Sequence, residues 1–131
     1  MEPRTTSFLA LFTEGRTRFT KVLDTLAEAD MEKKLAPSPN SAGFLIRHIG
    51  DVELLFAKNV FGLADVQVRA STVAKGFDTG EWTDLAELKA YVQESADTLR
   101  RAIEATPDAE WDSFIETKEF GRKTKAEALG R

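Results

Sequence analysis

The chain has 131 residues, of which 42% are hydrophobic and 31% charged, with a net charge of −4. This composition predicts one globular domain over residues 1–131 and excludes a disordered chain. Because acidic and basic residues are interspersed, the charge argues against nucleic acid as a partner. The absence of cysteine excludes disulfides and thiolate ligands and favours a cytoplasmic location. No apolar run approaches the ~20 residues that a membrane span needs, so we expect no membrane contact.

The chain begins with a long predicted helix over residues 5–29. Apolar residues recur there at spacings of three and four from Phe8 to Leu26, which is the pattern of a helix in a bundle. The prolines of the segment 35–40 end this helix.

A second helix is predicted to start after Asn40 or Ser41, either of which offers an N-cap side chain. It should end near Gly62, with this glycine as a left-handed C-cap. The segment 63–82 has an irregular pattern with two glycines and predicts a long loop containing a short helical turn.

A third helix is predicted from residue 83 or 84, because Asp84 and Glu87 have the spacing of a capping box. It should stop at Pro107. A connecting segment with four large apolar residues follows and is expected to pack on the bundle, without a clear strand pattern: Trp111, Phe114, Ile115 and Phe120.

A fourth helix is expected to begin near Thr124, which forms a second capping-box pattern with Glu127. The sequence ends at Arg131, so we expect this helix to be truncated. Three explanations remain open: a shortened chain, a three-helix bundle with a stub, or a groove closed by a second subunit.

His48 is the only histidine, and helical spacing places it inside the apolar face of the second helix. An imidazole there needs a hydrogen-bond partner or a metal, because an unpaired buried polar group costs ~1–3 kcal/mol. Asp51, three residues later, either orients the imidazole or is a solvated carboxylate at the helix edge. Glu53 projects away from His48 and should be solvent-facing or in an ion pair.

The segment 40–53, NSAGFLIRHIGDVE, resembles the second-helix signature of the DinB/YfiT-like superfamily. The resemblance implies an all-α, up-down-down-up four-helix bundle that often forms a homodimer. It implies a divalent metal, nickel or zinc, bound by three histidines. One of these matches His48, and the other two form an H-x-x-x-H pair on the last helix.

The resemblance also implies a divalent-metal-dependent enzyme acting on a small-molecule substrate. Such an enzyme is a transferase that uses a low-molecular-weight thiol, or a hydrolase. The metal acts as a Lewis acid or lowers the pKa of a bound water or thiol.

No histidine follows His48, so the expected ligand pair either lies beyond Arg131 or has been lost. Three roles for His48 therefore stay open: a metal ligand, a hydrogen-bonded core histidine, and a general base in a metal-free site. The alternative function is that of a non-catalytic helical bundle that dimerises or binds a partner through an apolar groove.

Overall fold

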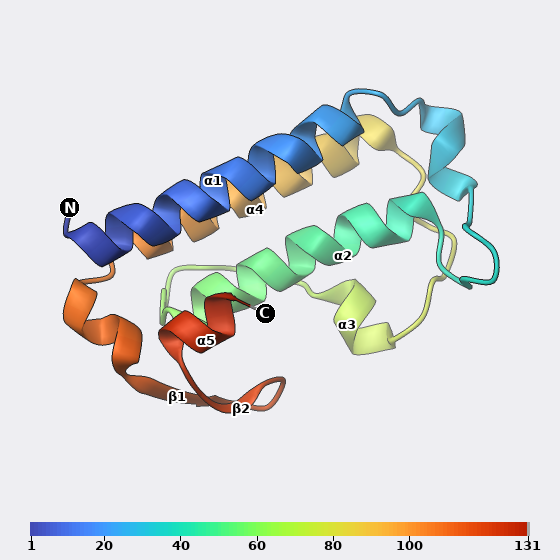
Figure 1. Cartoon of the computed structure of the whole chain (residues 1–131). Helices are drawn as coiled ribbons and strands as arrows, with labels where there is room; N and C mark the ends of the chain where they lie inside the picture. Colours follow the sequence, from blue (N-terminus) through green and yellow to red (C-terminus); the bar gives the residue numbers. More distant parts are fainter. Residues whose placement is uncertain (131) are drawn as a thin grey trace.

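The computed structural model describes residues 1–130, and three long helices dominate them. They are α1 (Pro3–Leu23), α2 (Ala42–Leu55) and α4 (Leu85–Glu104). Figure 1 shows that α1 runs opposite to both α2 and α4, which gives the up-down-down order. The predicted all-α bundle is therefore confirmed.

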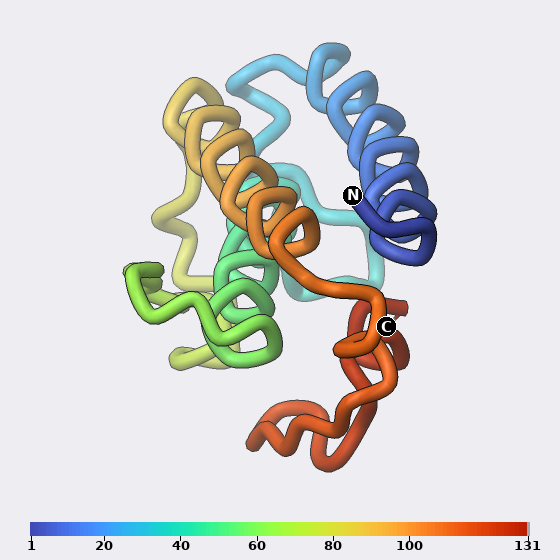
Figure 2. The backbone as a smooth tube through the Cα atoms, turned by 90° about the vertical axis from the view of Figure 1, so that its left-hand side faces the viewer, coloured from blue at the N-terminus to red at the C-terminus, as the bar shows by residue number. Residues whose placement is uncertain are grey.

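Helix α4 is the central element of the bundle. It packs against both α1 and α2, whereas α1 and α2 have few close approaches to each other. The view along the bundle in Figure 2 shows α4, in orange, beside both of its neighbours. A cavity lies between α1 and α2, lined by Phe12, Val52 and, from α4, Leu99.

Helix α1 ends at Leu23, six residues before the predicted end. The chain leaves the helix because the Thr25 hydroxyl donates to the carbonyl of Val22, which competes with the helical pattern. A 3-10 turn (Glu28–Glu32) follows and places Met31 in the core with no exposed surface. The apolar spacing thus continues past the helix, but in a different backbone conformation.

Helix α2 begins as predicted, because the Ser41 hydroxyl accepts a hydrogen bond of 3.2 Å from the amide of Phe44. After Leu55 the chain continues as a π turn (Phe56–Val60). Gly62 then adopts a left-handed conformation with φ of 73° and ends the element where the sequence predicted.

The segment between α2 and α4 is the predicted loop with a short helical turn, α3 (Ser71–Lys75). Asp84 caps α4 by accepting a bond of 3.1 Å from the amide of Glu87. Figure 1 places α3 beside the middle of α2.

After α4, a second 3-10 turn (Asp108–Asp112) leads to a hairpin of β1 (Phe114–Thr117) and β2 (Gly121–Thr124). The hairpin corrects the expectation of a connecting segment without strands. Its strands have four residues each, which is too short for an alternating pattern to be recognised. Trp111, which precedes it, is fully buried, whereas Phe114 remains exposed.

The expected fourth helix begins as α5 (Lys125–Leu129), within residues 1–130. Thr124 and Glu127 form the predicted capping box, with bonds of 3.1 Å in both directions. In Figure 1, α5 turns back toward the middle of α2, opposite to the direction of α2 itself.

The core has two clusters, one at each end of the bundle. The first surrounds Trp111, whose ring lies 4.4 Å from that of Phe8. The second surrounds Met31, Phe44 and Trp82. No helix within residues 1–130 is long and apolar enough to cross a membrane.

Candidate functional site

His48 lies in the middle of α2 and is half-buried. Its ring stacks on Phe44 with a centroid distance of 5.8 Å and an interplanar angle of 8°. The Nδ1 atom lies 3.0 Å from the Oγ1 atom of Thr72, in α3. The imidazole therefore has the hydrogen-bond partner that its position on an apolar face required.

Thr72 connects His48 to a buried carboxylate. Its hydroxyl donates to Oδ2 of Asp51 over 2.6 Å, and its backbone amide donates to the same oxygen over 3.0 Å. Both Thr72 and Asp51 are buried. The loop carrying α3 is thus attached to α2 by hydrogen bonds next to the histidine.

The second oxygen of Asp51 is also fully used. Oδ1 accepts a bond of 2.9 Å from Nε of Arg47 and another from the hydroxyl of Tyr91, in α4. The guanidinium of Arg47 lies 4.0 Å above the Tyr91 ring and donates to the carbonyl of Arg69 over 3.0 Å. Four donors therefore converge on one carboxylate, which is the number of its lone-pair sites.

Burial, followed by the hydrogen bond to Asp51, raises the pKa of Tyr91 well above its usual value. The phenol therefore stays protonated and acts as a donor to Asp51. We call this set of residues the Asp51 network: Arg47, His48, Asp51, Thr72 and Tyr91.

Gly50 makes the network possible. A Cβ atom at this position would lie 2.5 Å from Cε2 of Tyr91, closer than real side chains approach. The absence of a side chain lets the tyrosine ring lie directly on α2 and reach Asp51 one residue later.

The structure decides between the two interpretations of Asp51. A solvated carboxylate at the helix edge is wrong, because Asp51 has no exposed surface. Asp51 reaches His48 only through Thr72. Sequence reasoning missed Thr72, which lies in an irregular segment 24 residues after His48 and has no local pattern that marks it.

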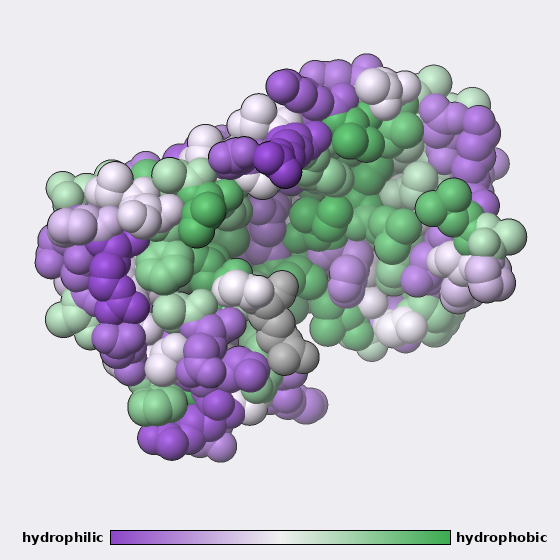
Figure 3. Space-filling view, viewed as in Figure 1, coloured by the Kyte–Doolittle hydropathy of each residue, from purple (hydrophilic) through white to green (hydrophobic). Residues whose placement is uncertain are grey.

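A second feature is an apolar cavity of about 260 Å³ between α1 and α2, with one carboxylate among the side chains that line it. Figure 3 shows apolar residues gathered over α2 and the neighbouring side of α1. We call this cavity the α1–α2 groove, and the residues that line it are Phe12, Val52, Glu53, Phe56, Leu99, Phe120 and Leu129.

Glu53 is buried in this groove, which raises the pKa of its carboxyl above the usual value. The Ser95 hydroxyl donates to it over 2.7 Å, and Nη2 of Arg16 lies 3.8 Å away. The prediction of an ion pair is therefore confirmed, whereas the solvent-facing alternative is wrong.

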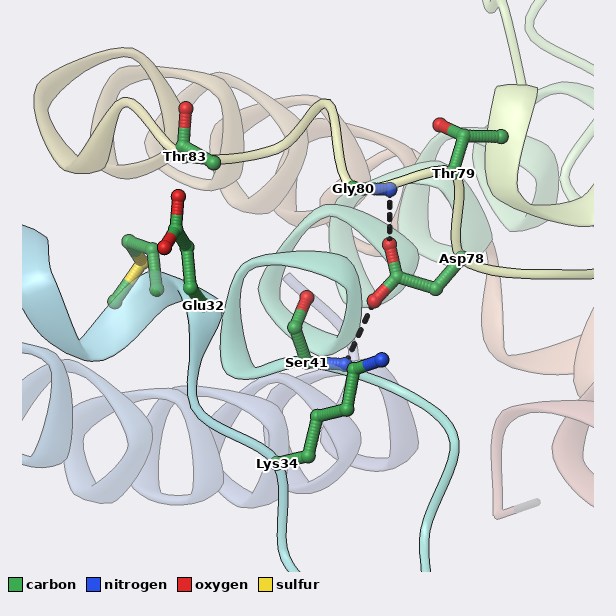
Figure 4. Close-up of a pocket in the computed structure, with 8 residues that line it drawn as sticks. Glu32, Lys34, Ser41, Asp78, Thr79, Gly80 and Thr83 are labelled. Atoms are coloured by element: carbon green, nitrogen blue, oxygen red, sulfur yellow. Dashed lines mark hydrogen bonds between the residues drawn. The ribbon is translucent and has the colours of Figure 1, made fainter.

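A more polar cavity of about 380 Å³ lies at the beginning of α2 (Figure 4). Its central contact is Asp78, whose two oxygens accept bonds of 2.7 Å from the amide of Ser41 and 2.8 Å from the amide of Gly80. Both oxygens thus hold the loop against the start of α2. The lining residues do not include His48, so this cavity is separate from the Asp51 network.

The described residues provide only part of the metal site that the resemblance implies. A catalytic zinc-type site uses three protein ligands and an open position. Within residues 1–130, no group of three or more His, Cys, Asp or Glu side chains is placed to hold a metal ion. Asp51 cannot be a ligand without losing its donors, so His48 is the one candidate ligand of the network.

The fold and the site together define a class of protein: an all-α bundle with a supported histidine on its second long helix. Comparison with known protein families agrees with this class, because the sequence model of the DinB superfamily matches residues 11–131. The chain belongs to the DinB superfamily. The searches of curated proteins and of solved structures returned no match.

Proposed function

We propose that this member of the DinB superfamily is a divalent-metal-dependent enzyme for a small-molecule substrate, with His48 as one metal ligand. The observation that carries the proposal is the hydrogen bond between Nδ1 of His48 and Thr72, which leaves Nε2 as the nitrogen available to a metal. Metal-binding imidazoles characteristically have such a partner on their other nitrogen.

The proposal requires at least two further ligands that residues 1–130 of a single chain do not supply, for example from a second copy of the chain. Nickel and zinc are the metals that the family resemblance favours, and a low-molecular-weight thiol is the proposed co-substrate. Because the described residues do not complete the site, we derive no reaction step through the metal.

The test is elemental analysis of the protein purified without a histidine tag, which matters because His48 is its only histidine. We expect near-stoichiometric nickel or zinc in the wild-type chain and loss of that metal in His48→Ala. Asp78→Asn is the matched control, because it alters a carboxylate in the cavity that is separate from the Asp51 network and should keep the metal. Metal-free wild-type protein after incubation with nickel and zinc would contradict the proposal, as would retention of metal by His48→Ala.

A second candidate function is association through the α1–α2 groove, with a second copy of this chain as the partner. Three apolar residues of α1 and α2 favour it by their exposure: Leu11 is 68% exposed, Val22 56% and Leu45 43%. Helical spacing places Leu45 in line with Val52, which lines the groove. A dimer formed there would bring a second set of side chains to the same face of α2 as His48.

A further inference from the structure

The hydrogen bonds of the Asp51 network determine where the proton of His48 resides. The hydroxyl of Thr72 has a single proton, and it contacts two groups, Oδ2 of Asp51 at 2.6 Å and Nδ1 of His48 at 3.0 Å. It can donate to only one of them and must accept from the other.

The carboxylate of Asp51 determines which of the two groups receives the proton of the Thr72 hydroxyl. Asp51 has only acceptor sites, and its remaining sites already receive Nε of Arg47, the Tyr91 hydroxyl and the amide of Thr72. The Thr72 hydroxyl therefore donates to Asp51 and accepts from His48. Nδ1 of His48 must carry the hydrogen.

We infer that Asp51 and Thr72 are positioning residues that fix His48 with its proton on Nδ1, so that Nε2 is its basic and ligating atom. A free histidine side chain favours the opposite arrangement, with the proton on Nε2. The network reverses this preference, because a proton on Nε2 would place two acceptors, Nδ1 and Oγ1, against each other.

The network also fixes the orientation of the ring. Phe44 stacks on the imidazole, and Thr72 holds its Nδ1 edge. Thr72 is itself held through both its amide and its hydroxyl by Asp51, which Arg47 and Tyr91 hold from the other side. These contacts restrict the rotation of the imidazole about its side-chain bonds.

This inference deepens the proposed site, but it is tested on the metal-free full chain. Labelling with ¹⁵N-histidine gives signals from one imidazole, because the chain has one histidine. Long-range ¹H–¹⁵N correlation, at a pH where the ring is neutral, distinguishes the two ring nitrogens. We expect a protonated Nδ1 and an unprotonated Nε2 in the wild-type protein.

The variants test the roles of the positioning residues. Thr72→Val removes the hydroxyl, and the Nδ1–H form should be lost in favour of the form found in free histidine. Thr72→Ser keeps the hydroxyl and should keep the wild-type tautomer. A folded Thr72→Val variant with the wild-type tautomer would overturn the role of Thr72.

The wild-type measurement needs no variant and therefore decides the inference even if Thr72→Val does not fold. A wild-type ring with its proton on Nε2, or with a mixture of both forms, would overturn it. If the Nδ1–H form is found and metal is absent, the proton assignment stands and the proposed metal-dependent function fails. The tautomer inference and the proposed metal-dependent function can therefore fail independently of each other.

Discussion

At the scale of single residues, two glycines in long helices have opposite surroundings. Gly50 faces the Tyr91 ring, where a Cβ atom would lie 2.5 Å from the nearest ring carbon. Gly15 has nothing within 4 Å of the same position. The first glycine is required by a close contact, whereas the second only adds flexibility to α1.

We therefore predict opposite effects of the same substitution. Gly50→Ala should lower the free energy of unfolding by about 1–3 kcal/mol, because the tyrosine must leave α2 and Asp51 loses a donor. Gly15→Ala should raise it by about 0.5–1 kcal/mol through helix propensity. Urea unfolding measures both. Equal stability of the two variants would mean that Tyr91 is not held against α2.

At the scale of elements, the beginning of α1 is capped from far away. Its N-cap residue, Glu2, provides no side-chain bond to the helix. Asp108, in the turn after α4, instead accepts bonds of 2.9 Å from the amides of Arg4 and Thr5. Burial alone would raise the pKa of Asp108, but these bonds outweigh it and hold the pKa below its usual value.

The lowered pKa gives a pH-dependent prediction for Asp108→Asn. The ionised Asp108 stabilises the folded chain above its unfolded pKa, and this contribution is lost as pH falls through the lower, folded pKa. The variant should therefore be less stable than the wild type at neutral pH, with the difference shrinking in acid. Urea unfolding over a pH series measures it, with the exposed Asp65→Asn as control. A difference that did not change with pH would contradict the charge-based cap.

At the scale of the whole molecule, the bundle has two faces of different character. Helix α4 fills one side of α1 and α2, whereas α5 reaches only one end of the groove on the other, through Leu129. Glu53 is the charged residue among those that line this groove, and it contacts Arg16 and Ser95. A partner that covers the groove would bury apolar surface that residues 1–130 leave exposed.

We predict that the wild-type chain has twice the mass of a single chain in light scattering at micromolar concentration. Leu45→Lys should give the mass of one chain, because it places a charge next to the groove. The control is Leu35→Lys, at a loop residue that is 81% exposed and outside the groove. A monomeric wild-type protein would overturn association through the groove, and so would a dimer that Leu45→Lys leaves intact.

Local signals made most of the fold predictable. The caps at Asp84 and Thr124 lie where the sequence placed them, and Ser41 is one of the two residues that it offered as the cap of α2, because a cap is decided by neighbours within four residues. The position of His48 followed from helical spacing. The predicted end of α1 was wrong, because the apolar spacing continues into a 3-10 turn that packs Met31 into the core.

The support of the candidate site was not predictable, because its contacts join distant segments. Thr72 lies 24 residues after His48, and Tyr91 lies 40 residues after Asp51. No period or motif links such positions in a single sequence. Asp51 was recognised as a neighbour of His48, but only the position of α3 shows that a hydroxyl lies between them.

The distant cap of α1 has a consequence for the order in which the chain folds. Asp108 joins Arg4 across 104 residues, and closing so long a loop is slow compared with forming a helix. During synthesis, α4 and Asp108 are made after α1, so α1 finds its cap and its neighbouring helix late. Helix α1 is therefore among the last elements to be fixed, and its apolar face stays exposed until α4 and the turn at Asp108 have formed.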